Sequence, residues 1–186
     1  MSAEFQASGI QLELLTGNFN TVDDSLLLST VLVTFGRYPH SRGRLTVVDR
    51  EHVERALDHL RLGGLADRYL DELSGGQRQR AFVAMVLCQD TDYLLLDEPL
   101  NNLDMKHAVE MMRFLRRAVD ELGKTVVVLH DINFASVYSD HIVALRDGRV
   151  VRQGAPADIL RSDALWTVYD LGIAIHDIDG HRIGVF

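Results

Sequence analysis

Two adjacent carboxylates, Asp97 and Glu98, directly follow the apolar run at residues 93–96. If that run is a strand of a parallel sheet, the pair lies at its carboxyl end, where open α/β sheets bind ligands. One carboxylate there is placed to hold Mg²⁺, usually through water. The second is placed to orient or deprotonate an attacking water. The alternative is a solvated loop after the strand, and the pair alone does not decide between the two.

A glycine-rich turn, Ser74-Gly75-Gly76-Gln77, opens an apolar helix upstream of this strand. Two glycines at a helix start expose backbone N–H groups, the helix dipole adds partial positive charge, and the serine hydroxyl adds a donor. Together these features suit a phosphate. The alternative is structural, in which Ser74 caps the helix and the glycines form a tight turn.

His130 ends a second apolar run, at residues 125–129. If the two runs are neighbouring strands, His130 lies near Glu98 and its imidazole is placed to contact a terminal phosphate. The alternative is an ordinary polar end of a strand. The other histidines lack ligand-like spacing and are expected at the surface or satisfied in the core: His40, His52, His59, His107, His141, His176 and His181.

The segment Gly123-Lys124-Thr125 imitates the end of a phosphate-binding loop, G-x-x-x-x-G-K-[ST]. The first glycine of that pattern would fall on Ala118, inside a helix, and a strand follows where the loop needs a helix. We therefore exclude these residues as a phosphate site.

Hydrophobic spacing predicts the elements that position these groups. Residues 93–96 and 125–129 are continuous apolar runs, typical of strands buried on both faces. The amphipathic segment 105–122 between them completes a βαβ unit with parallel strands. The helix at about residues 76–89 is apolar nearly all round, which indicates burial.

Upstream, residues 35–44 are typical of a turn-rich, basic loop. Thr46 and Asp49 have the spacing of a capping box at the start of a helix. Gly63-Gly64 ends that helix, and a short helix at residues 65–70 leads to the glycine-rich turn.

The chain divides into three predicted parts. Residues 1–34 are an atypical N-terminal segment, in which residues 26–33 fit a strand or a short helix. Residues 35–90 form a small helical subdomain. Residues 91–186 form an α/β core that closes with short helices and two hairpins, centred on Asp147-Gly148 and Asp179-Gly180.

Composition excludes several classes of protein. The 186 residues carry a formal net charge of −8, so no nucleic-acid partner is expected. No stretch is long and apolar enough to span a bilayer, which favours a cytosolic chain that reaches a membrane only through a partner. The one cysteine, Cys88, lies in an apolar run and is expected in the core.

Taken together, these motifs resemble the ATP-binding subunit (nucleotide-binding domain) of ABC transporters. Residues 73–77 match the LSGGQ signature of that family, residues 93–98 its Walker B strand with the following glutamate, and residues 101–104 its D-loop. His130 falls at its switch histidine. The resemblance covers residues 35–186. It implies an α/β fold: a partial P-loop NTPase core of parallel strands and flanking helices, with a small helical subdomain.

The resemblance also implies roles and partners. Asp97 would hold the water shell of Mg²⁺, Glu98 would be the general base, and His130 would contact the terminal phosphate of ATP. Residues 74–77 would contact the ATP of a paired subunit, and Asp104 would couple the two sites. The partners would be a second ATPase subunit, an integral-membrane permease and, indirectly, a substrate-binding protein, all at the cytoplasmic side of the cell membrane.

Residues 35–44 and 173–186 look like the branch that serves iron-siderophore, haem and cobalamin importers. Residues 1–30 depart from the family pattern, because they contain no phosphate-binding loop and the region around Phe19 lacks the Q-loop glutamine. We therefore expect an N-terminally incomplete ATPase that is weak or inactive alone, with apolar sheet edges exposed. The alternative is a non-catalytic module that donates LSGGQ to a partner ATPase or docks on a permease.

Overall fold

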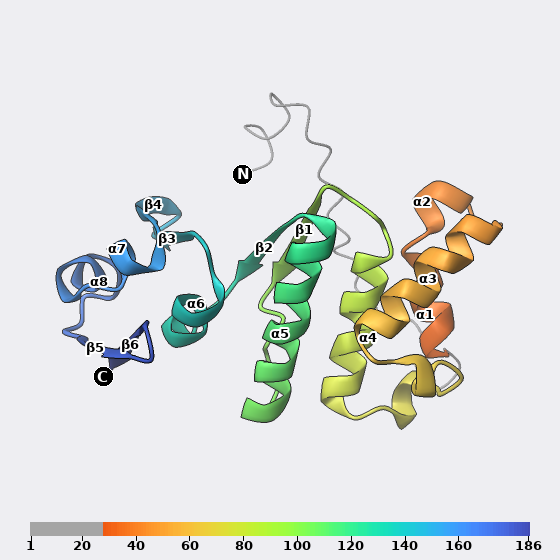
Figure 1. The fold of residues 1–186 in the computed structure, drawn as a ribbon, viewed down its shortest axis with the longest axis horizontal. Helices are drawn as coiled ribbons and strands as arrows, with labels where there is room; N and C mark the ends of the chain where they lie inside the picture. The colour runs from red at the N-terminus through yellow and green to blue at the C-terminus, as the bar shows by residue number, and fades with distance from the viewer. Residues whose placement is uncertain (1–27) are drawn as a thin grey trace.

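The computed structural model describes residues 28–186, which form three consecutive groups of elements (Figure 1). The first group contains α1 (Ser29–Phe35), α2 (Tyr38–Ser41), α3 (Val47–His59), two 3₁₀ turns, η4 (Gly63–Leu65) and η5 (Leu70–Glu72), and α4 (Gly75–Leu87). The second group contains β1 (Tyr93–Asp97), α5 (Met105–Leu122) and β2 (Lys124–Val128). The third group contains α6 (Ile132–Tyr138), β3 (Ile142–Arg146), β4 (Arg149–Gly154), α7 (Pro156–Ile159), α8 (Ser162–Tyr169), β5 (Ala174–Ile178) and β6 (His181–Val185).

From the sequence, residues 1–27 lack a phosphate loop and depart from the family pattern. These residues lie outside the range that the structure describes. Of the segment at residues 26–33, residues 29–33 belong to α1, and Leu28 forms an isolated antiparallel bridge with Tyr69. None of the described helices has both the length and the apolar character needed to cross a membrane.

The capping box predicted at the start of α3 is confirmed. The Oγ1 atom of Thr46 accepts a hydrogen bond from the backbone N–H of Asp49, and the Asp49 carboxylate accepts one from the backbone N–H of Thr46. Two other predictions for this group are wrong. Residues 35–44 are partly helical, because Pro39 favours the first turn of α2. Residues 65–70 form no α-helix, because the preceding Gly63 and Gly64 favour tight 3₁₀ turns.

A buried ion pair ties the helices of the first group together. Arg37 and Asp49 are 5% and 4% exposed, and the Nε atom of Arg37 donates to Asp49 at 2.9 Å. The same guanidinium donates to the carbonyl oxygen of Cys88, just after α4. Hydrogen bonds from Thr46 and then from Arg37 lower the pKa of Asp49 to about 2. Burial raises the pKa of the Cys88 thiol to about 11, as expected for a core cysteine.

The predicted βαβ unit is confirmed. Strands β1 and β2 are parallel, with Tyr93 opposite Lys124 and Asp97 opposite Val128. Helix α5 ends at Leu122, as its amphipathic pattern predicted. The carboxyl ends of the two strands therefore lie side by side, which positions the residues that follow them.

Burial on both faces of this sheet was expected, and that expectation is wrong. Leu94 and Leu96 are 7% and 8% exposed and join a core with residues of α4 and α5, whereas Leu95 is 44% exposed. On β2, Val126 and Val128 are about half exposed. The reason is the number of layers: in the described part of the chain, helices cover only one face of β1–β2. We refer to the open face, formed by Tyr93, Leu95, Val126 and Val128, as the open sheet face.

Both predicted hairpins form in the third group. Their turns place Asp147 and Asp179 at φ of 52° and 51°, each followed by a glycine with positive φ, as a two-residue turn requires. Strand β6 is fixed to α6, because Ser136 donates to the carbonyl oxygen of Arg182 at 2.6 Å and Asn133 binds both backbone groups of Gly184. Helix α6 thus connects this group to the end of β2 (Figure 1).

Candidate functional site

The predicted site residues, together with neighbours that contact them, fall into two groups. The first, the strand-end group, contains Asp97, Glu98, Asn101 and His130. The backbone N–H of Glu98 donates to the carbonyl oxygen of Val128, which extends the β1–β2 ladder by one residue. Glu98 has a left-handed backbone, with φ of 47°, a conformation that costs energy for a residue other than glycine.

In the strand-end group, both oxygens of the Glu98 carboxylate are engaged. The Nε2 atom of His130 donates to one oxygen, and the side-chain amide of Asn101 donates to the other. The structure thus brings Glu98 and His130 together, because their strands are neighbours. Asn101 is a contact that the sequence did not predict, although its position three residues after Glu98 in a tight turn is the signal that could have found it.

These hydrogen bonds set the protonation of Glu98. The pKa of its carboxyl group is lowered, first by the hydrogen bond from Asn101 and then by that from His130. Glu98 is therefore ionised at neutral pH, the state that a general base needs. Because each carboxylate oxygen can accept two hydrogen bonds, Glu98 can still bind a water molecule and accept a proton from it. His130 has a side chain that is 76% exposed, so it is free to turn toward a ligand.

Asp97 lies beside this pair at the end of β1. Its side chain is exposed, and within residues 28–186 no hydrogen bond or ion pair engages its carboxylate. The described residues also contain no group of three or more His, Cys, Asp or Glu side chains that could hold a metal ion. One free carboxylate suits Mg²⁺, which keeps most of its water shell and binds proteins through one or two carboxylates.

The second group, the signature group, contains residues 74–77, Asp104 and His107. Ser74 caps α4: its hydroxyl oxygen accepts from the backbone N–H of Gln77 at 3.3 Å, and the side chain of Gln77 accepts from the backbone N–H of Ser74 at 2.9 Å. The structural alternative for these residues, in which Ser74 caps the helix, is therefore present in the structure. It leaves the Ser74 hydroxyl proton and the first N–H groups of α4 available, because the first turn of a helix has no internal acceptors for them.

The two glycines of the signature group have different surroundings. A Cβ atom placed on Gly75 would meet nothing within 4 Å, whereas one on Gly76 would lie 2.8 Å from the Cδ2 atom of His107. Gly75 keeps the backbone open to a ligand. Gly76 lets the first turn of α4 approach the first turn of α5.

Asp104 caps α5. Its Oδ1 atom accepts from the backbone N–H of His107 at 2.9 Å, and both carboxylate oxygens lie 2.9 Å from Nδ1 of the same residue. The pKa of Asp104 is lowered, mainly by the hydrogen bond from the His107 backbone. Asp104 therefore lies close to residues 74–77 through His107. Within the described part of the chain, no hydrogen bond or ion pair joins the signature group to the strand-end group.

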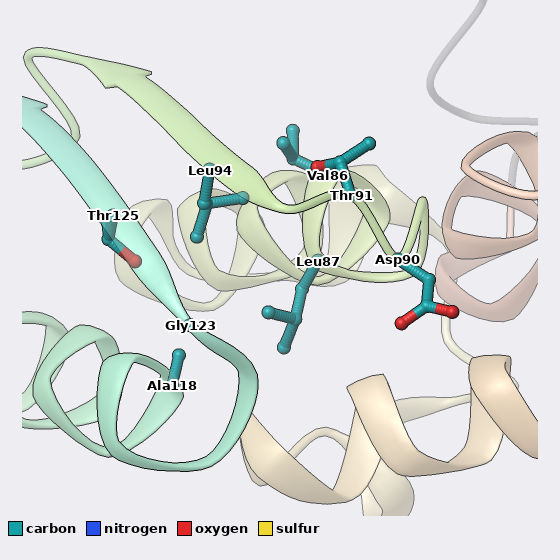
Figure 2. Close-up of a pocket in the computed structure, with 8 residues that line it drawn as sticks. All are labelled: Val86, Leu87, Asp90, Thr91, Leu94, Ala118, Gly123 and Thr125. Carbon is teal, nitrogen blue, oxygen red and sulfur yellow. The ribbon is translucent and has the colours of Figure 1, made fainter.

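Residues of the strand-end and signature groups line neither of two cavities in the described part of the chain. One cavity of about 30 Å³ lies between the sheet, α4 and the end of α5, and it is lined in part by Leu87, Leu94 and Thr125 (Figure 2). It holds at most about one water molecule. A wider cleft of about 600 Å³ lies between α3 and the ends of α4 and α5. Residue 124 begins β2, so a strand follows Gly123 and the rejection of a phosphate loop there is confirmed.

Comparison with known proteins establishes the class. The sequence model of the ABC transporter family matches residues 6–101, more than half of the 186 residues. The chain therefore belongs to the ABC transporter family. The match begins at residue 6. This start lies upstream of residue 35, from which the resemblance was traced in the sequence.

Individual relatives indicate which branch of the family the chain resembles. The chain is 60% identical over 156 residues to the petrobactin import ATP-binding protein YclP of Bacillus subtilis, covering 83% of this chain and 62% of the relative. It is 44% identical over 149 residues to the ferric enterobactin transport ATP-binding protein FepC of Escherichia coli, covering 78% and 55%. The resemblance to siderophore-import subunits is confirmed. The chain spans only about three fifths of the length of these relatives.

Solved structures confirm the fold. A transporter assigned to the metal-chelate ABC type, in an inward-facing conformation, superposes with a TM-score of 0.75 at 25% identity, over 86% of this chain and 67% of that one. CbiO1 of Clostridium perfringens, part of the ABC transporter complex cbiONQ, superposes with a TM-score of 0.62 at 30% identity, over 73% and 53%. The predicted α/β ABC ATPase fold is therefore confirmed.

Proposed function

We propose that this chain acts as an ATP-binding subunit of an ABC importer for iron-siderophores or related metal chelates. The observation that carries the proposal is the Glu98–His130 pair at the ends of two adjacent parallel strands. It occurs in a chain that is 60% identical to a petrobactin import ATP-binding protein. The substrates are ATP and, for the whole transporter, the chelate.

The residues of the strand-end group have distinct roles in this proposal. Bound Mg²⁺ neutralises the phosphate charge of ATP, and Asp97 holds its water shell. Glu98, kept ionised by Asn101 and His130, accepts a proton from the attacking water through a lone pair that these hydrogen bonds leave free. His130, exposed and next to Glu98, turns to the terminal phosphate.

The signature group acts on a different ATP molecule. Residues 74–77 offer a serine hydroxyl and open backbone N–H groups from a helix N-terminus, which suits a phosphate held by a second subunit. Asp104 lies at the adjoining cap of α5 and couples the two sites of a subunit pair. The three-part division at residues 34 and 90 then separates a helical part, which carries the signature, from the core that carries the strand-end group.

We also propose that these 186 residues hydrolyse ATP negligibly by themselves. Their sequence contains no G-x-x-x-x-G-K-[ST] loop, and such a loop supplies the lysine and the hydroxyl that hold the phosphates and Mg²⁺. An ATPase assay on the purified chain tests this. We expect turnover at the background rate; turnover at ordinary ATPase rates that Glu98→Gln abolishes would overturn the proposal.

Exposed apolar side chains favour a second function, a non-catalytic interaction module. Phe35, Tyr38, Val47 and Val48 lie on α1, α2 and the start of α3, and Val47 is 73% exposed. Such residues suit docking on a permease at the cytoplasmic side of the membrane, with a substrate-binding protein acting on the other side. In this function the chain supplies only its signature group to a complete ATPase subunit.

A mixed-subunit assay tests the donation of the signature group, which both functions include. The chain is combined with a complete family subunit that has a phosphate loop but whose own signature serine is replaced by alanine. Restored turnover that requires Ser74 supports donation of the signature group. Absence of restored turnover argues against it.

A further inference from the structure

His107 connects the two halves of the signature group. We propose that His107 is a positioning residue that fixes the first turn of α4 against the cap of α5 and so sets how residues 74–77 are presented to an ATP held by a partner subunit. This inference rests on the proposed donation of the signature group.

The α5 side of the ring is fixed by hydrogen bonds. The Nδ1 atom of His107 lies 2.9 Å from each oxygen of the Asp104 carboxylate, and its backbone N–H donates to the same group. Because an ionised carboxylate only accepts hydrogen bonds, Nδ1 carries the proton. The two contacts to Nδ1 orient the imidazole toward Asp104, and the backbone N–H holds the carboxylate in place.

The α4 side of the ring is fixed by van der Waals contact. A Cβ atom on Gly76 would lie 2.8 Å from Cδ2, 2.9 Å from Cγ and 3.2 Å from Cβ of His107. The ring therefore rests directly on the backbone of Gly76, which is buried. Movement of the ring toward α4 would push the backbone between the Ser74 cap and Gln77, and loss of the ring would remove the support of that backbone.

The position of this contact gives it a functional consequence. Gly76 belongs to the first turn of α4, whose N–H groups point toward the proposed phosphate, and Asp104 belongs to the proposed coupling segment. His107 touches both, and its side chain is 32% exposed. A displacement of a phosphate donor by about 1 Å is enough to cost on the order of 100-fold in rate. The ring therefore sets the distance between the N–H groups of α4 and the proposed phosphate, while it makes no contact with the nucleotide itself.

Two substitutions separate the contacts of His107. In His107→Asn the side-chain amide replaces Nδ1 as the donor to Asp104, and the ring that rests on Gly76 is lost. In His107→Ala both contacts are lost. The matched control is His59→Asn. It removes an imidazole at the end of α3 whose side chain is 10% exposed and which contacts the carbonyl oxygen of Phe114, in α5 but away from the first turn of that helix.

The mixed-subunit assay is the functional test, with ATP as the probe and Ser74→Ala as the reference. We expect His107→Ala to lower the restored kcat by about 10-fold or more, His107→Asn to have an intermediate effect, and His59→Asn to have none. The KM for ATP should change little, since the partner's loop grips the nucleotide. Hydrogen exchange of the Gln77 amide, which measures local opening, should accelerate in His107→Ala and not in His59→Asn.

The outcomes distinguish the two proposals. If Ser74→Ala abolishes restored turnover and His107→Ala leaves kcat and Gln77 exchange unchanged, the positioning role is wrong and the donation of the signature stands. If the unmodified chain restores no turnover, the donation is wrong and the positioning role falls with it. If His107→Asn restores most of what His107→Ala loses, the hydrogen bond to Asp104 carries most of the effect.

Discussion

The strand-end group and the signature group are built in opposite ways. The strand-end group joins residues that are 32 positions apart, Glu98 and His130, and it forms only because β1 and β2 pair. The signature group uses two local helix caps, at Ser74 and Asp104, joined by one packing contact through His107. The first group therefore depends on the sheet, whereas the second depends on caps that each helix makes for itself. Substitutions in the sheet should disturb the first group before the second.

The largest effect is expected for Leu96→Ala. Leu96 is 8% exposed and directly precedes Asp97, so its truncation should lower the free energy of unfolding by about 2–5 kcal/mol. The matched control is Leu95→Ala, on the open sheet face, which should cost under about 1.5 kcal/mol. Urea unfolding of both variants measures the difference. Equal losses would show that the two faces of β1 are buried alike.

The next effect is expected for Gly76→Ala. The added methyl group meets the His107 ring, and such overpacking costs about 1–3 kcal/mol. Gly75→Ala, where the methyl group meets nothing, should be neutral or stabilise by up to about 1 kcal/mol. In the His107→Ala background the cost of Gly76→Ala should largely disappear. A double-mutant cycle by thermal unfolding measures this coupling, and additive costs would rule out the contact.

Two capping boxes of the same kind should differ in stability and in pH dependence. Thr46→Ala should cost about 1 kcal/mol and more than Ser74→Ala. The reason is that Asp49 of the Thr46 box is buried with Arg37, whereas the Ser74 box is exposed. The pKa of Asp49 is lowered from 3.8 to about 2 on folding. Its contribution is therefore present above pH 3.8 and is lost as the pH falls through about 2. Unfolding measured from pH 6 down to about pH 2 should show the two variants converging, and a constant difference would contradict this.

The smallest effect on stability is expected for Asn101→Ala, at an exposed turn. Its amide is the largest cause of the lowered pKa of Glu98, so its removal should raise that pKa toward the ordinary value. A ¹³C NMR titration of the Glu98 carboxyl group measures the change, with Asp104 as an internal reference. An unchanged Glu98 titration would mean that His130 alone sets the ionisation.

The sequence predicted those parts of the molecule that depend on local patterns. The capping box at Thr46, the span of α5 and the Asp-Gly hairpins follow from residues close together in the chain, and the structure has them. It also has the helix cap at Ser74, which was the structural alternative for that turn. The βαβ unit also followed, because a helix between two apolar runs leaves few topologies.

The features that the sequence did not predict are the open sheet face and the roles of Asn101 and His107. The open sheet face was expected to be buried, because an apolar run at residues 93–96 does not show how many layers cover it. The role of His107 was missed, because it depends on Gly76, which only the folded chain places beside it. The role of Asn101 was missed although its partner, Glu98, is only three residues away.

The mixed-subunit assay with Ser74→Ala tests the central claim most directly, namely that the signature group serves the ATP of a partner subunit. Adding the 186-residue chain to a signature-disabled complete subunit should restore ATP turnover. Removal of the Ser74 hydroxyl should lower the restored rate by about 100-fold or more, as expected for the loss of one donor to a transition-state oxygen. Restored turnover that is the same with serine or alanine at position 74, or no restored turnover at all, would contradict the account.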